Sequence, residues 1–151
     1  MIAANLEKIS ALIHQLLEKV PREELVDMVI FGSSAFTLQG KDLKRMVNDL
    51  DLFASVRAYE RLKERAVEWE KKPGVFALDL GIPDVEVLKD IPGVTHADVL
   101  GRAALTKGSQ GLLVAALEDL VTWKRAKARP KDLADLKVLG IGTEWSSRCK
   151  K

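Results

Sequence analysis

The sequence predicts an α/β fold, in which a small mixed β-sheet is flanked by helices. Residues 2–19 carry apolar side chains at three- and four-residue spacing, which is typical of an amphipathic helix. The apolar run 26–31 is typical of a buried strand, and it ends at Gly32-Ser33-Ser34, a sequence suited to a tight turn and a helix start. Residues 75–80 and 84–88 predict two strands around the turn Gly81-Ile82-Pro83.

The rest of the chain supplies the remaining elements. Residues 48–53 predict the strand after the Gly-Ser turn, and 57–71 predict a helix that ends at Pro73-Gly74. A short helix is expected over 95–103 with Thr95 as its cap, and two short strands over 103–106 and 111–115. Two helices follow, over 118–128 and from Pro130 to about 139. We expect one domain over 1–142 and a frayed tail over 143–151.

Composition narrows the class of protein. The chain has 151 residues, 47% of them hydrophobic and 30% charged, which favours one domain with a substantial core. The net charge of +2 gives no reason to expect bulk polyanion binding. The one cysteine, Cys149, excludes a disulfide framework and a cysteine-rich zinc site. With no signal peptide and no membrane-spanning run, we expect a cytoplasmic protein without a membrane partner.

Two carboxylates mark a candidate metal site. On a strand, residues two apart share a face, so Asp49 and Asp51 point one way while Leu50 and Leu52 point the other. Two acids on one face repel each other unless a cation lies between them, and paired carboxylate oxygens suit Mg²⁺. The alternative is a solvated strand face.

The order strand, Gly-Ser, helix and Asp-x-Asp resembles the nucleotidyltransferase superfamily, which includes the DNA polymerase beta-like and the minimal nucleotidyltransferases. The resemblance implies that Gly32, Ser33 and Ser34 hold nucleotide phosphates, and that Asp49 and Asp51 hold Mg²⁺ or Mn²⁺. The spacing departs from the pattern. Fifteen residues separate Ser33 from Asp49, more than in the minimal members, and we expect residues 39–45 to extend the helix or the loop after it.

The resemblance also implies a third carboxylate on a neighbouring strand, as general base or as a further metal ligand. Glu86 is the best match because it lies between two valines in mid-strand, and Asp84, nearer the turn, is the second choice. The alternative is an edge strand whose acids face outward to prevent sheet pairing.

The C-terminal stretch resembles one branch of the same superfamily, that of the type IV toxin–antitoxin and abortive-infection nucleotidyltransferases. The resemblance implies that Lys124 neutralises triphosphate charge and that Asp132 orients it or a backbone turn. The alternative is a basic helix end followed by a capped helix. The matching residues are Lys124, Arg129, Lys131, Asp132 and Asp135.

Three functions remain open. The first is a Mg²⁺-dependent enzyme that moves a nucleoside monophosphate from an NTP, with ATP favoured, to an unidentified hydroxyl acceptor. The second is a non-catalytic nucleotide-binding module on the same fold. The third is a toxin–antitoxin-type protein that acts in a complex. At 151 residues there is little room for an acceptor domain, so a homodimer or a partner protein would have to supply that surface.

Overall fold

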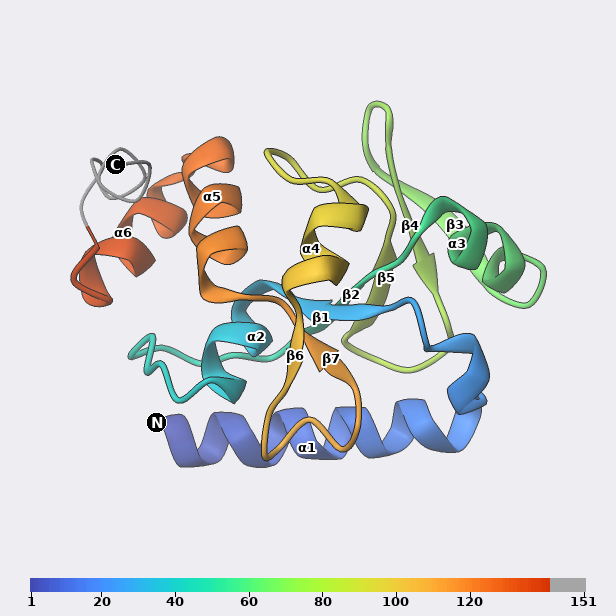
Figure 1. The fold of residues 1–151 in the computed structure, drawn as a ribbon, viewed down its shortest axis with the longest axis horizontal. Coiled ribbons are helices and arrows are strands. Elements are labelled where there is room, and N and C mark those ends of the chain that lie inside the picture. Colours follow the sequence, from blue (N-terminus) through green and yellow to red (C-terminus); the bar gives the residue numbers. More distant parts are fainter. Residues whose placement is uncertain (142–151) are drawn as a thin grey trace.

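The computed structural model describes residues 1–141, which form six α-helices and a seven-stranded mixed sheet (Figure 1). The predicted α/β fold is confirmed. The helices are α1 (Ile2–Lys19), α2 (Gly32–Leu38), α3 (Val56–Lys63), α4 (His96–Arg102), α5 (Leu117–Lys127) and α6 (Pro130–Val138), with a 3₁₀ turn at Arg22–Glu24. The strands are β1 (Val29–Phe31), β2 (Leu50–Phe53), β3 (Val67–Lys72), β4 (Val75–Asp79), β5 (Val85–Leu88), β6 (Ala104–Leu105) and β7 (Leu113–Val114).

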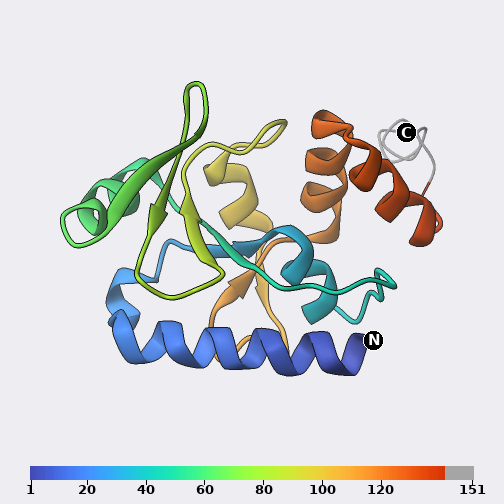
Figure 2. The ribbon, with the colours of Figure 1, turned by 180° about the vertical axis from the view of Figure 1, so that it is seen from behind.

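The strands follow the order β3-β4-β5-β2-β1-β7-β6. The pairs β1–β7 and β2–β5 are parallel, and the other pairs are antiparallel. In Figures 1 and 2, α1 lies below the central strands, whereas α4 and α5 lie above them. The central strands are therefore covered on both sides, which explains why β1 is buried at every position.

The first helix has the predicted bounds. Its apolar stripe is buried in the core, and the helix ends just before Pro21, where the chain turns extended. The first strand is shorter than predicted, because residues 22–28 form a 3₁₀ turn and a bend before Val29. The buried residues of the stripe are Ile9, Leu12, Ile13 and Leu16.

The predicted helix over 57–71 is wrong in its second half. Helix α3 ends at Lys63, and Val67–Lys72 forms the edge strand β3, which pairs with β4 across the turn at Pro73 and Gly74. The stretch combines good helix formers with Val67 and Trp69, which favour strands. Pairing with β4 decides the outcome, and Gly74 (φ +79°) permits the turn that makes this pairing possible.

The alternative that β5 is an outward-facing edge strand is also wrong. β5 is an inner strand that pairs with β4 on one side and β2 on the other, so Glu86 has a paired residue on each neighbouring strand. Asp84 lies just before β5 with a left-handed backbone (φ +68°), at the turn where the sequence places it.

The C-terminal half follows the prediction closely. Thr95 caps α4 by accepting a hydrogen bond from the Asp98 backbone at 3.3 Å, and β6 and β7 form the expected hairpin. Pro130 opens α6. The expected tail over 143–151, with Cys149, lies outside the described residues. No helix in the described part of the chain is long and apolar enough to cross a membrane.

Candidate functional site

A cleft of about 1420 Å³ opens between the β3–β4 hairpin, the ends of β1, β2 and β5, and the junction of α5 and α6. It gathers most of the predicted site residues, which lie up to 99 positions apart in the sequence (131 − 32). Ser34, Lys124 and Asp132 do not line it. The predicted residues that line it are Gly32, Ser33, Asp49, Asp51, Asp84, Glu86, Arg129 and Lys131.

The Gly-Ser turn lies directly against the second aspartate. β1 pairs with β2 so that Phe31 is opposite Asp51, and Gly32 follows at once. Gly32 has φ +72°, and a Cβ atom added to it would lie 2.9 Å from Asp51 Oδ2. A side chain here would be strained and would collide with the carboxylate, so this position requires glycine. The backbone turn and the acid thus form one surface.

The two serines after this glycine hold different parts of the site. The buried Ser34 hydroxyl donates a hydrogen bond to the backbone carbonyl of Asp49, and so fixes the chain just before β2. The half-buried Ser33 hydroxyl accepts a hydrogen bond from Arg45 Nη2 at 2.7 Å and lines the cleft. The structure therefore favours a positioning role for Ser34, and leaves Ser33 able to contact a ligand.

The acids form the floor of the cleft. Asp51 on β2 is paired in register with Glu86 on β5, so the two side chains lie on the same face of the sheet. Asp49 is exposed just before β2, whereas Asp51 is half-buried. Burial, followed by the charges of Glu86 and Asp49, raises the pKa of Asp51 to about 6, although the charges of Lys71 and Lys131 oppose this rise.

The candidates for the third carboxylate have different partners. Glu86 forms an ion pair with Lys71 at 2.7 Å, and the exposed Asp84 forms one with Lys8 at 3.3 Å. Within residues 1–141, no group of three or more His, Cys, Asp or Glu side chains is arranged to hold a metal ion. Asp49 and Asp51 both line the cleft, and a divalent cation held between them would offset their negative charge. Glu86 could join them only by leaving Lys71.

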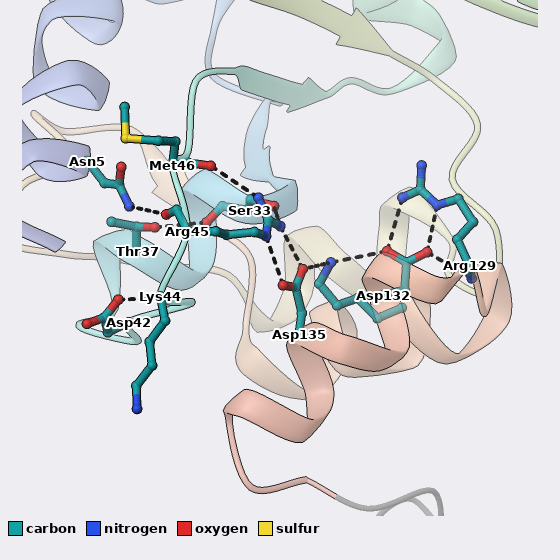
Figure 3. A network of polar contacts seen from close by, with 11 residues as sticks. Asn5, Ser33, Thr37, Asp42, Lys44, Arg45, Met46, Arg129, Asp132 and Asp135 are labelled. Carbon is teal, nitrogen blue, oxygen red and sulfur yellow. Dashed lines mark hydrogen bonds and ion pairs between the residues drawn. The ribbon is translucent and has the colours of Figure 1, made fainter. Parts of the chain in front are cut away.

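Arg45 joins the Gly-Ser turn to the last helix (Figure 3). It lies in residues 39–45, which lengthen the loop after α2 and not the helix, one of the two outcomes expected. Its Nε and Nη2 atoms donate to the two carboxylate oxygens of Asp135 at 2.8 and 2.6 Å, while Nη2 also reaches Ser33. Sequence reasoning missed Arg45, although the lengthened spacer and its basic residues were the available signal.

Lys124 is fully buried and does not face the cleft. Its Nζ atom lies 3.2 Å from Asp132 Oδ1 and 2.8 Å from Asp135 Oδ2, and 4.7 Å from the centre of the Trp123 ring. The direct phosphate contact predicted for Lys124 is therefore not available in this geometry. Its link to the site runs through Asp135 to Arg45.

The predicted Asp132 is equally buried, and its partners hold it ionised. Arg129 donates to Asp132 from Nε at 2.6 Å and from Nη2 at 3.0 Å, and its backbone N–H donates at 3.2 Å. Burial alone would raise the pKa of Asp132, but the Arg129 hydrogen bond and the Lys124 charge outweigh it and lower this pKa to about 2. Asp132 therefore anchors the start of α6 by accepting from the Arg129 backbone, an arrangement that the alternative of a simple capped helix also predicts.

Sequence reasoning also missed cleft residues on the hairpin and on α5. Lys71 and Trp69 lie in the stretch predicted as a helix. Because the stretch is instead a strand, in which residues two apart share a face, the prediction did not put these two side chains together on the cleft wall. Trp123 and Lys127 lie on α5 beside the residues that the C-terminal resemblance selected.

A scan against protein-family models and searches of curated proteins and of solved structures found no match to this chain.

Proposed function

We propose that this protein is a nucleotidyltransferase that uses Mg²⁺ or Mn²⁺ to move a nucleoside monophosphate from an NTP, with ATP favoured, to a hydroxyl acceptor. One observation carries the proposal. The Gly32 backbone, in a conformation that glycine adopts easily, lies against the Asp51 carboxylate, with Glu86 beside it on the next strand of the same cleft. A backbone suited to phosphate beside acids suited to metal is the arrangement that the resemblance implies, and it supports the proposal.

Each residue has a role in the proposed reaction. Asp49 and Asp51 would hold the divalent cation, which supplies charge neutralisation and orientation of the triphosphate. The Gly32–Ser33 backbone and the Ser33 hydroxyl bind phosphate oxygens, and Arg45 orients that hydroxyl. Glu86 lies on the acceptor side and takes the hydroxyl proton. The acceptor oxygen bonds to the α-phosphorus, the bond to the β-phosphate oxygen breaks, and pyrophosphate leaves.

The test is calorimetric titration of Mg²⁺ and NTP into the wild type and into Asp49→Asn/Asp51→Asn. The proposal expects Mg²⁺-dependent binding to the wild type, weakened at least tenfold in the double variant because the cation loses both charged ligands. Glu7→Gln/Glu23→Gln is the matched control, since it removes two exposed acids outside the cleft and should bind as the wild type does. Binding that ignores metal and the double substitution, or no binding at all, would overturn the proposal.

A second candidate is a non-catalytic nucleotide-binding module, or a toxin–antitoxin-type module that acts with a partner protein. The Glu86–Lys71 ion pair at 2.7 Å favours it, because that contact occupies the carboxylate needed on the acceptor side. Incubation with α-labelled ATP, CTP, GTP and UTP and a mixture of acceptors separates the two. An enzyme transfers label in the wild type and fails in Glu86→Gln with nucleotide affinity retained, whereas a binding module transfers none.

A further inference from the structure

Five basic side chains gather at the mouth of the cleft, and we name them the cleft-mouth cluster. They come from two parts of the molecule that project on the same side in Figures 1 and 2: the tip of the β3–β4 hairpin, and the junction where α5 ends and α6 begins. All five line the cleft whose floor carries the acids. The members are Lys71, Lys72, Lys127, Arg129 and Lys131.

The cluster has more positive charge than its neighbours balance. Lys71 is paired with Glu86 and Arg129 with Asp132, but Lys72, Lys127 and Lys131 form no ion pair with any acid of residues 1–141. Basic side chains without counter-ions repel each other, and an anion placed among them relieves this repulsion.

Lys127 shows this imbalance most clearly. It is half-buried, and its pKa is lowered first by burial and then by the charges of Arg129, Lys72 and Lys71. The lysines of the hairpin therefore act on a lysine of α5, across the mouth of the cleft. Both walls of the cleft thus present cationic side chains to a ligand between them.

The inner end of the cluster reaches the proposed reaction centre. Lys71 forms an ion pair with Glu86, which is paired in register with Asp51, whereas Gly32 and Ser33 approach Asp51 from the end of β1. An anion on the cluster would thus lie beside the acids, apart from the phosphates assigned to the Gly-Ser turn.

The cleft also has room for a second ligand. Its volume of about 1420 Å³ exceeds the roughly 300–1000 Å³ typical of a site for one small molecule. Trp69, 43% exposed on the cleft wall, has Lys71 Nζ 5.9 Å from its ring centre, and so offers an apolar surface next to the cationic one.

We propose that the cleft-mouth cluster is a phosphate-binding site, and that it receives the phosphate groups of the acceptor molecule. The anion site stands on the cluster alone, whereas its assignment to the acceptor rests on the proposed nucleotidyl transfer. The chemistry expected of the acceptor is a hydroxyl to be modified and at least one phosphate group within the length of the cleft. Phosphates of the NTP itself are the other source of the same chemistry, and the test separates the two.

The first arm titrates inorganic tripolyphosphate into the protein without metal, and measures binding by calorimetry at low ionic strength. The variant Lys72→Ala/Lys127→Ala/Lys131→Ala removes the three lysines without acidic partners, and we expect its affinity to fall at least tenfold. The control Lys41→Ala/Lys107→Ala/Lys137→Ala removes the same charge from exposed positions outside the cleft, and should bind within twofold of the wild type. Equal binding by all three proteins, or no binding, would overturn the anion site.

The second arm measures Mg²⁺-dependent NTP binding by the same proteins. If the cluster serves the acceptor, the cluster variant binds NTP within twofold of the wild type. A fall in NTP affinity that matches the fall for tripolyphosphate would overturn the assignment to the acceptor and place the nucleotide phosphates on the cluster. The arms fail independently, because Asp49→Asn/Asp51→Asn should lose NTP yet bind metal-free tripolyphosphate at least as tightly as the wild type. If no protein binds NTP, the proposed function and the assignment to the acceptor both fail, and the first arm still decides the anion site.

Discussion

At the scale of single residues, keeping Asp51 ionised in the site lowers the stability of the folded protein. It is half-buried beside Glu86 and Asp49, and the Gly32 backbone covers one side of its carboxylate. Its pKa rises from 3.8 to about 6, which corresponds to roughly 1–3 kcal/mol of lost stability when the folded protein holds it ionised. The arrangement is one that a bound cation would stabilise.

Replacing Asp51 by Asn should therefore stabilise the unliganded protein in a pH-dependent way. Because the folded pKa is raised, the stability linked to Asp51 is complete below the unfolded value of 3.8 and is lost as the pH rises through about 6. Asn does not titrate. We expect the thermal midpoint of Asp51→Asn to exceed that of the wild type by about 2–8 °C at pH 7.5, and the difference to shrink as the pH falls to 4.

Thermal melts from pH 4 to 7.5, without divalent cations, would measure this difference. Asp90→Asn, which neutralises an exposed acid of the same cleft, is the control and should follow the wild type at every pH. A difference that does not change with pH, or that favours the wild type at pH 7.5, would contradict the account of Asp51.

At the scale of elements, the buried ions between α5 and α6 fix the angle at which the two helices meet. Lys124 on α5 is enclosed between Asp132 and Asp135 of α6, and Arg129 and Arg45 complete the partners of these two acids. The turn between the helices passes through Ala128 in a left-handed conformation (φ +49°). Removing one member of such a group is costly, because it leaves the remaining charges buried without their partner.

Lys124→Met should lower the free energy of unfolding by about 3 kcal/mol or more, since methionine fills much of the space but leaves the two carboxylates without their shared cation. Urea denaturation would measure the loss. Lys137→Met changes an exposed lysine of the same helix pair and should cost less than about 0.5 kcal/mol.

Lowering the pH should reduce the difference in the free energy of unfolding between the wild type and Lys124→Met. The pKa of Asp132 is lowered to about 2, so its contribution to stability is present above its ordinary value of 3.8 and is lost as the pH falls toward 2. The pKa of Asp135 is lowered as well, by hydrogen bonds from Arg45 and Lys124 that outweigh the opposing effect of burial. A cost of Lys124→Met that stays constant down to pH 2 would show that packing, rather than charge, holds the helices.

At the scale of the whole molecule, the contacts of Arg45 couple the first half of the chain to the last helix. Ser33, Arg45 and Asp135 form a continuous chain of contacts from the Gly-Ser turn to α6. If nucleotide binds at Ser33 as proposed, the binding energy should reach α6 along this path.

Hydrogen exchange gives the corresponding test. Saturating Mg²⁺ and ATP should slow amide exchange in residues 39–48 and in α6 of the wild type. The first segment contains Arg45, which orients Ser33, and α6 contains Asp135, which anchors Arg45. In Arg45→Met the effect on α6 should disappear. The neighbouring Lys44→Met, whose side chain points away from Asp135 in Figure 3, should keep it. Protection of α6 that survives Arg45→Met would contradict the coupling.

Much of the fold could be predicted because its signals are local. The stripe of α1, the Gly-Ser turn, the pair Asp49 and Asp51, and the cap at Thr95 each depend on residues a few positions apart. β3 could not be predicted, since helix formers and strand formers alternate there and only pairing with β4 decides between them. The pairing of Arg45 with Asp135 was equally out of reach, because the two residues are 90 positions apart.

That same separation sets the order in which the site is assembled during synthesis. At roughly 5–20 residues per second, Arg45 is made about 5–18 s before Asp135, which follows it by 90 positions. In this interval the Gly-Ser turn can pack on the strands already made, but Arg45, which donates to Ser33, is not yet anchored by Asp135. The group that orients the Ser33 hydroxyl in the proposed nucleotide site is thus fixed in place only when α6 docks.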